Sequence, residues 1–392
     1  MAGAKSESLS SRQGCAGGSR SGIPGCAMDS APKPLKLFIP GPTEVAPEVL
    51  AEMARSAIGH RTPACAELWA SCREGLRRLF QTEQEILMLT GPASAFMEAA
   101  IRNFVSRKSL HLVCGAFSKR WYEMAVACGK EATAFEVPWG EGFRPEALDA
   151  ALAMGDYEAV TLVHNETSTG VMNPLAELAE VVQGHPEVLL LVDTVSSLAG
   201  APVAFDDMKL DFCLAGVQKA LALPAGLAVA AVSERALQRA AEVADRGWFL
   251  DVLRLVTSNQ KEQSPTTPST AHLYALQFQL QRIFEEGLVA RWQRHAAMSE
   301  RTQAWALQQG FELFAADGFR SQTVSCIGRG DGPDFVPALQ NLLQQGLLVS
   351  NGYGKLKNQT FRIGHMGEHR MSDLEDLLSR FESALQVGEK VQ

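Results

Sequence analysis

The sequence lacks several features that mark whole classes of protein. It has no apolar run of the roughly 20 residues needed to cross a bilayer, because its most apolar segment, LALPAGLAVAAV, is interrupted by proline and glycine. It has no C-x-x-C pair and no cluster of lysine and arginine, and 36 basic against 44 acidic residues give a net charge of −8. We therefore expect no membrane span, no zinc or other metal site and no nucleic-acid partner.

The eight cysteines are scattered along the chain, and half or more of them stand in apolar periodic segments. They are Cys15, Cys26, Cys65, Cys72, Cys114, Cys128, Cys213 and Cys326. Thiols in such segments are typically buried and unpaired, as is usual in a reducing compartment. We therefore expect a cytoplasmic protein.

Residues 1–33 differ in composition from the rest of the chain. Gly, Ser, Ala and Arg dominate there, and large apolar side chains are almost absent. No apolar core of a secretory signal occurs in this segment, and we predict a disordered extension. A transit peptide is the alternative, because Ser and Arg are frequent and acids are few, and Met28 is an alternative start.

After residue 34, short apolar runs alternate with longer amphipathic stretches. This alternation is typical of βα units, which form a parallel sheet between helices. The predicted strands include EILMLT, LHLVCG, AVTLVHN, VLLLVDT, FCLAGV and GLAVAAVS. A polar Pro/Thr-rich loop and a long helical region, 271–309, follow. We predict a large domain over 34–285 and a smaller α+β domain over 286–392.

A lysine and an aspartate provide the main chemical signal. Asp193 ends the apolar run EVLLLVD, and Lys219 lies in DFCLAGVQKALALPAG among small residues. A lysine amine can form a Schiff base with an aldehyde cofactor such as pyridoxal phosphate, and a buried carboxylate can keep the cofactor's ring nitrogen protonated. Each residue alone also fits a plainer interpretation, a surface lysine or a helix-capping aspartate.

Four further motifs follow predicted strands or lie within one. The turn Thr90–Ala95 opens a helix and suits a phosphate, although a plain helix cap has the same pattern. Phe117 offers a ring for stacking or for the core. The polar cluster HNETSTG either binds a cofactor oxygen or forms an ordinary turn. Arg362 lies within an apolar strand and needs a carboxylate, from a substrate or from a protein side chain.

Together these residues resemble the class V aminotransferases of PLP fold type I, most closely the alanine–glyoxylate and serine–pyruvate aminotransferases. The resemblance covers nearly everything after residue 34, and its most specific strings are VDTVSSLAG, VQKAL and FRIGHMG. It implies an α/β fold with pyridoxal 5′-phosphate as cofactor. The large domain would contain a mainly parallel seven-stranded sheet between helices, followed by a smaller C-terminal α+β domain.

The resemblance also implies a role for each site residue. Lys219 and Asp193 would be catalytic, through the Schiff base and the pyridinium nitrogen. Arg362 would bind the substrate carboxylate close to the turn at Gly41. The remaining cofactor contacts would be the phosphate ligands Ala93, Ser94 and Gln218 with Thr266 from the neighbouring subunit of a homodimer, the ring contacts Phe117 and Val195, and Ser168 at the phenolic oxygen.

Two positions depart from the family pattern. Pro92-Ala93-Ser94 stands where relatives often have Gly-rich sequence, and Phe117 stands where some have Trp or Tyr. We expect phosphate binding there to rely on backbone groups more than on side chains.

The expected activity is a ping-pong transamination from a small amino acid, alanine or serine, to glyoxylate or pyruvate. The sequence does not identify the donor and acceptor pair, although His60, Arg61 and Tyr353 are candidates for the substrate pocket. The alternatives are an aminoethylphosphonate or other ω-amine transaminase, a cysteine-desulfurase-like lyase that uses Cys326, and a binding protein with a vestigial site.

Overall fold

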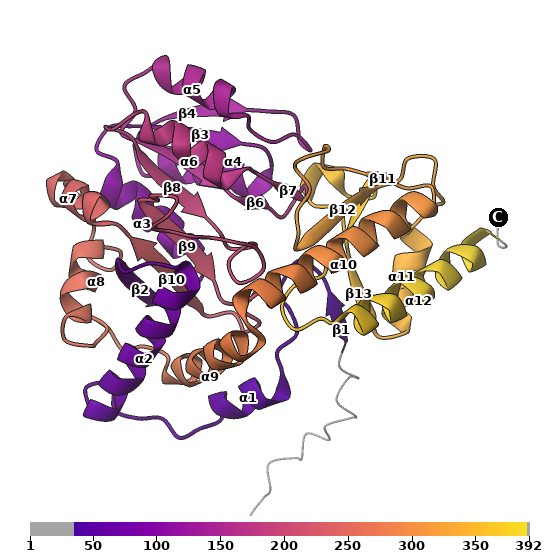
Figure 1. Cartoon of the computed structure of the whole chain (residues 1–392), viewed down its shortest axis with the longest axis horizontal. Coiled ribbons are helices and arrows are strands. Elements are labelled where there is room, and N and C mark those ends of the chain that lie inside the picture. Colours follow the sequence, from indigo (N-terminus) through magenta and orange to yellow (C-terminus); the bar gives the residue numbers. More distant parts are fainter. Residues whose placement is uncertain (1–34, 390–392) are drawn as a thin grey trace, which may run out of the picture. The chain divides into compact units, whose positions relative to one another are not determined.

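The structure is a computed structural model that describes residues 35–389. The predictions for residues 1–33 lie outside the described residues. The described part forms one compact unit that contains two main sheets (Figure 1). No helix within it is both long and apolar enough to span a membrane.

The larger sheet has seven strands in the order β2-β10-β9-β8-β5-β3-β4. Only β10 runs antiparallel to its neighbours, so the predicted mainly parallel seven-stranded sheet is confirmed. The strands are β2 (Glu85–Thr90), β3 (Lys108–Val113), β4 (Glu131–Glu136), β5 (Ala159–Val163), β8 (Leu189–Asp193), β9 (Phe212–Gly216) and β10 (Leu227–Val232). The sequence did not predict β4, because this edge strand is largely half-exposed and lacks a continuous apolar run.

Helices cover both faces of this sheet, which explains why its strands are apolar at successive positions. Alternate side chains of a strand point to opposite faces. Ile86 and Met88 join one core, and Leu87 and Leu89 join the other. The first core includes α2 (Pro63–Phe80), α5 (Pro145–Ala153), α6 (Leu175–Gln183) and α9 (Thr270–Glu286). The second includes α3 (Ser94–Phe104), α4 (Ala116–Ala127), α7 (Glu234–Glu242) and α8 (Val252–Asn259).

The smaller sheet combines both ends of the described chain. Its order is β1-β13-β14-β12-β11, and β1 pairs in parallel with β13. The strands are β1 (Lys36–Phe38), β11 (Glu312–Leu313), β12 (Val324–Gly328), β13 (Leu347–Asn351) and β14 (Thr360–Gly364). A third core packs it against α10 (Leu288–Gln308), α11 (Val336–Gln344) and α12 (Met371–Glu389). The exact boundaries between the two predicted domains stay a prediction.

Short elements connect these layers. They are α1 (Pro47–Met53), the hairpin of β6 (Asn165–Glu166) and β7 (Val171–Met172), and the 3-10 helix η1 (Gly354–Leu356). The helical region predicted over 271–309 is two helices, α9 and α10. Gly287 separates them with a φ of 85°, which glycine adopts more readily than residues with a side chain.

Candidate active site

The candidate residues gather at the carboxyl ends of the central strands. Asp193 is the last residue of β8, Lys219 follows β9, and Phe117 lies in the first turn of α4 after β3. Parallel strands end at the same edge of a sheet, and open α/β sheets bind their ligands there. The sheet therefore brings together residues that are far apart in the sequence.

Lys219 has a buried amine with an altered pKa. The residue is only 9% exposed, and its Nζ donates a hydrogen bond to the carbonyl of Pro40. Burial, assisted by the charge of Arg362, lowers the pKa of this amine to about 8. Asp193 and Glu166 act in the opposite direction. A substantial fraction of the amine is therefore unprotonated, and so nucleophilic, in mildly alkaline solution.

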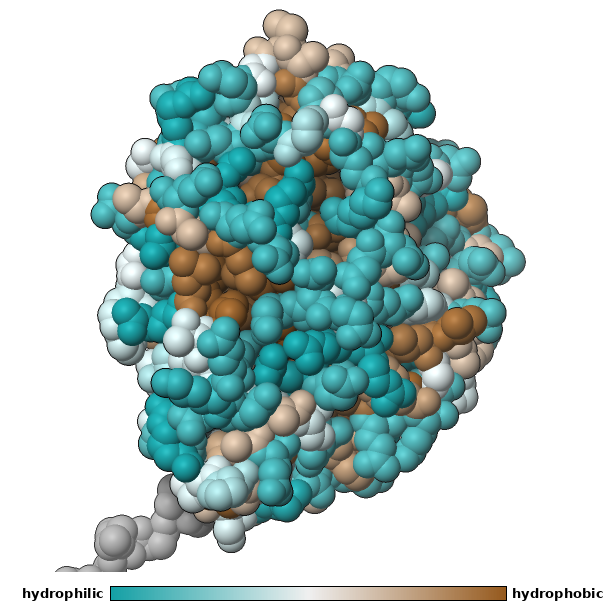
Figure 2. All heavy atoms as spheres, turned by 60° about the vertical axis from the view of Figure 1, so that its left-hand side comes forward, coloured by the Kyte–Doolittle hydropathy of each residue, from teal (hydrophilic) through white to brown (hydrophobic). Residues whose placement is uncertain are grey.

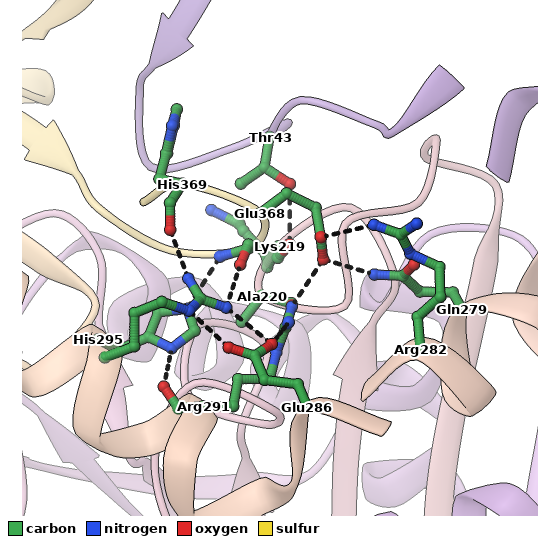
Figure 3. Close-up of polar contacts among 12 residues, drawn as sticks. Thr43, Lys219, Ala220, Gln279, Arg282, Glu286, Arg291, His295, Glu368 and His369 are labelled. Carbon is green, nitrogen blue, oxygen red and sulfur yellow. Dashed lines mark hydrogen bonds and ion pairs between the residues drawn. The ribbon is translucent and has the colours of Figure 1, made fainter. Parts of the chain in front are cut away.

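The turn after β1 packs directly against Lys219. Gly41 has a φ of +124°, and a Cβ at this position would lie 2.9 Å from the lysine Nζ. Thr43 donates from its backbone N–H to Gln218 O at 3.1 Å and from its Oγ1 to Lys219 O at 2.9 Å. Figure 3 shows Thr43 above the lysine. Only glycine fits this close approach of backbone to amine.

Asp193 is a buried carboxyl group with one oxygen in a hydrogen bond. Its Oδ1 accepts from the N–H of Val195 at 2.7 Å. Burial raises the pKa of Asp193 to about 7, and the charge of Glu166 acts in the same direction. A cation in contact with this carboxyl group would favour its ionised form.

The first turn of α3 offers free donors to an anion. The backbone N–H groups of Ala93 and Ser94 donate to no acceptor among residues 35–389. Gln218 lies beside them, because a Cβ at Gly216 would meet both Gln218 Oε1, at 2.6 Å, and Ala93 Cβ, at 3.2 Å. These groups can bind a phosphate through N–H donors and the helix dipole.

Glu166 is a central residue that the sequence analysis did not identify. It is fully buried and accepts hydrogen bonds from the backbone N–H groups of Phe117 and Ser118, at 3.1 and 2.9 Å. The hydroxyl group of Ser168 donates to it at 2.6 Å and accepts from Ala116 N–H at 3.0 Å. In this structure the Ser168 proton is thus directed to Glu166, and the contact of Ser168 with the cofactor stays a prediction. An acid within HNETSTG, directly after an apolar strand, was the available signal.

Arg362 lies in β14 and is 8% exposed. Its guanidinium donates to the carbonyls of Thr167 and Asn351, both at 3.2 Å. No acidic side chain within the described part of the chain forms a salt bridge with it, so it retains the capacity to bind a carboxylate. Its guanidinium carbon lies 5.5 Å from the ring centre of Tyr353.

Three predicted residues have surroundings that leave their roles open. Val195 is half-buried next to Asp193. Thr266 is half-buried, and its only hydrogen bond to another described residue runs from its N–H to Ser264 Oγ at 3.4 Å. Arg61 donates to Ser264 O at 2.7 Å, so it contacts the loop before Thr266. Their contacts with cofactor or substrate stay predictions.

The donor set fits pyridoxal phosphate. The lysine amine suits the aldehyde, Asp193 suits a protonated ring nitrogen, and the first turn of α3 suits the phosphate. Gly41 supplies a close backbone approach that a Cβ would fill. Across residues 35–389, no group of three His, Cys, Asp or Glu side chains is placed to bind a metal ion.

Comparisons with known proteins agree with this chemistry. The family model described as aminotransferase class-V matches residues 37–326. The chain is 41% identical to an uncharacterized aminotransferase of Methanocaldococcus jannaschii, over 84% of this chain and 87% of that protein. It is 33% identical to serine–glyoxylate aminotransferase of Methylorubrum extorquens, over 85% and 86%. The structure of alanine–glyoxylate aminotransferase from Nostoc sp. superposes with a TM-score of 0.84 at 32% identity, over 90% and 95%.

The buried amine of Lys219 predicts a pH-dependent cost in stability. Its pKa of about 8 lies below that of an exposed lysine, so folding is disfavoured while the amine is protonated, and this cost falls as pH rises above 8. Lys219→Met is expected to stabilise the cofactor-free protein by up to about 3 kcal/mol at pH 7 and by less at pH 9.5. Urea unfolding at both pH values measures this, with the exposed Lys357→Met as control. An equal gain at both pH values would contradict the buried-charge explanation.

Glu166→Gln tests the buried carboxylate. One carboxylate oxygen becomes an NH₂ group, which must then face hydrogen-bond donors of Phe117, Ser118 or Ser168. We expect a loss of about 2–4 kcal/mol in unfolding free energy, since buried donors lose a charged acceptor. Chemical denaturation measures the loss, and the exposed Glu131→Gln is expected to change it by under about 0.5 kcal/mol. Equal stability of the two variants would refute this role for Glu166.

Proposed function

The chain belongs to the class-V aminotransferase family, and on this premise we propose that it transfers the amino group of alanine or serine to glyoxylate or pyruvate. As a member it is a pyridoxal 5′-phosphate-dependent aminotransferase, and its similar proteins include a serine–glyoxylate and an alanine–glyoxylate aminotransferase. The observation that carries the finer proposal is Arg362, a buried guanidinium without a carboxylate partner among the described residues. An α-carboxylate supplies the missing partner.

Asp193, Arg362 and Lys219 would each have a separate role in transamination. When bound, the cofactor supplies an electron-withdrawing ring that stabilises negative charge at the substrate Cα. Asp193 would hold the positive charge on the ring nitrogen, and Arg362 would orient the substrate through its carboxylate. The Nζ of Lys219, with its lowered pKa, would then take the proton from Cα as a general base.

The surroundings of Arg362 favour a short side chain on the substrate. The rings of Phe117 and Tyr353 lie 5.4 Å apart, and Arg120 donates to the Tyr353 hydroxyl at 3.2 Å. Tyr353 also lies near Arg362, with 5.5 Å between the guanidinium carbon and the ring centre, so we infer that a substrate side chain bound there meets aromatic rings. A serine–glyoxylate and an alanine–glyoxylate aminotransferase among the similar proteins support the same substrate class.

The two catalytic alternatives fit less well. A cysteine-desulfurase-like lyase needs a reactive thiol on a mobile loop, but Cys326 is 4% exposed within β12, and burial raises its pKa to about 11. An aminoethylphosphonate transaminase has no need for an arginine at an α-carboxylate. A guanidinium can bind a phosphonate as well as a carboxylate, so the preference for an α-amino acid rests on the similar serine– and alanine–glyoxylate aminotransferases.

We also propose a homodimer in which the partner subunit completes the phosphate site through Thr266. Within one subunit, Thr266 has no described hydrogen bond to Lys219, Ser94 or Gln218. Figure 2 shows hydrophobic side chains gathered on an otherwise hydrophilic face. Trp248 and Phe249, between α7 and α8, are 55% and 45% exposed. Exposed apolar groups of this kind often mark a protein interface. The cytoplasmic location stays a prediction.

The absorption spectrum of the purified protein tests the proposed activity. The bound cofactor should give a yellow band, and L-alanine or L-serine, added without an acceptor, should bleach it as the amino group is transferred. L-Aspartate and aminoethylphosphonate are the comparison donors. Lys219→Ala should reduce turnover by at least about 10⁴-fold while retaining some cofactor, because the nucleophile and base are lost together. Full activity of this variant would defeat the assignment of Lys219.

Arg362→Gln tests the carboxylate site. We expect the KM for the amino donor to rise by about 10- to 100-fold, because a charge-assisted hydrogen bond contributes roughly 1.5–3 kcal/mol. The exposed Arg329→Gln is the control and should leave KM unchanged. Steady-state kinetics with several donor concentrations measure both. An unchanged KM in Arg362→Gln would place the carboxylate elsewhere.

A further inference from the structure

A buried network of ion pairs contacts the loop that carries Lys219, residues 217–223, which we call the lysine loop. Arg291, near the start of α10, is 1% exposed and forms salt bridges with Glu286 at 2.7 Å and Glu368 at 3.2 Å. Its Nη2 also donates to the carbonyl of Ala220 at 2.7 Å. Figure 3 shows the guanidinium between the two carboxylates and the lysine loop. Arg291 thus holds the carbonyl of the residue that follows the predicted catalytic lysine.

The lysine loop requires such support because its backbone is unusual. Ala222 has a φ of 54°, a left-handed conformation that residues with a side chain rarely adopt, and its N–H donates to Lys219 O. Two successive carbonyls of this turn are held from outside. Thr43 Oγ1 donates to Lys219 O at 2.9 Å, and Arg291 donates to Ala220 O.

The same network holds the segment that follows Arg362. This segment, 365–370, directly follows β14. Glu368 accepts from Gln279 at 2.8 Å and from Arg282 at 3.1 Å, in addition to Arg291. Arg294 pairs with Glu286 at 2.6 Å and also donates to the carbonyls of Gly367 and His369.

A neutral histidine adds a further link. Gly367 N–H donates to His295 Nε2 at 3.0 Å, which requires that nitrogen to be unprotonated. His295 Nδ1 must then donate to Arg291 O, at 2.7 Å. Burial lowers the pKa of this ring well below its ordinary value, in agreement with the neutral form. The ring therefore joins the backbone of α10 to the 365–370 segment in one fixed tautomer.

Stability alone does not explain these charges. Burial opposes the ionisation of Glu368, but the charge of Arg291 and the hydrogen bonds from Gln279 and Arg282 outweigh it and lower its pKa to about 2. Buried ion pairs usually gain little over apolar side chains of the same size, because the charges lose their hydration. Such ion pairs do fix the relative positions of the groups they join, since a guanidinium bound to several acceptors has one orientation.

We propose that Arg291 is a positioning residue that fixes the Lys219 loop relative to the strand carrying Arg362. This inference rests on the proposed function, in which one amino acid must place its carboxylate on Arg362 and its Cα at Lys219. Arg291 touches neither group. A shift of about 1 Å between reacting groups can lower a rate roughly 100-fold. The guanidinium connects Ala220 with Glu368, and so links the two elements that must keep their distance.

Arg291→Lys and Arg282→Lys form a matched pair that tests the proposal. Both arginines contact Glu368, but only Arg291 also contacts Ala220. A lysine keeps the charge and loses the fork that reaches three acceptors. In Arg291→Lys, kcat/KM for the amino donor should fall at least about tenfold. In Arg282→Lys it should stay within about twofold of the unsubstituted protein.

Hydrogen exchange of the cofactor-free proteins gives a readout that does not depend on activity. The amides of Ala222 and Leu223 donate within the lysine turn, to Lys219 O and Val217 O. In Arg291→Lys they should exchange about tenfold faster, while Arg282→Lys leaves them unchanged. Equal exchange in both variants would overturn the proposal, as would unchanged kcat/KM in Arg291→Lys.

A second variant distinguishes a local effect on the lysine loop from a general loss of folding. If Arg291→Lys unfolds, Arg291→Met combined with Glu368→Gln removes one charge of each sign and takes its place in both measurements. If the unsubstituted protein transfers no amino group, the proposed function fails. Faster exchange confined to the lysine turn would still support the contact of Arg291 with that turn.

Discussion

Burying the Lys219 amine costs free energy, because a protonated ammonium loses its water. The groups around the amine offset part of this cost. The amine meets the carbonyl of Pro40, and a turn containing Gly41 closes over it without a Cβ. That turn follows β1, which belongs to the smaller sheet. The lysine thus comes from one sheet while the backbone that covers it is anchored in the other.

Three other buried groups, Arg362, Asp193 and Glu166, affect the pKa of this amine through their charges. Glu166 accepts hydrogen bonds from backbone N–H groups and hydroxyls, whereas Arg362 donates only to carbonyls among the described residues. Groups left with such partners keep their capacity for a ligand. Asp193, with a pKa raised to about 7, also lacks a strong cationic contact. The site therefore has one acceptor, Asp193, and one donor, Arg362, that would suit the cationic ring and the anionic substrate of the proposed function.

The sequence predicted the sheet and its strand-end residues because apolar runs and their following polar residues are local signals. Asp193 ends such a run and Lys219 follows one, whereas Arg362 is a charge within an apolar strand, which is also a local signal. The pairing of β1 with β13 has no local signal, because it depends on partners from opposite ends of the chain. The contact of Arg291 with Ala220 and Glu368 is equally non-local, and in the sequence Arg291 resembles a surface charge of an amphipathic helix. The proposed contact of Thr266 with a partner subunit has no local signal either.

The proposed carboxylate site at Arg362 would connect substrate binding with the basicity of Lys219. Its positive charge is one reason why the pKa of Lys219 is lowered to about 8, second only to burial. In the proposed function, a substrate carboxylate bound to Arg362 would neutralise that charge, so the lysine amine would become more basic when an amino acid occupies the site. The empty site would then have a larger unprotonated fraction of the Lys219 amine, and the occupied site would have a stronger base. The two properties suit successive roles of one residue, and both depend on keeping the arginine and the lysine at a fixed separation.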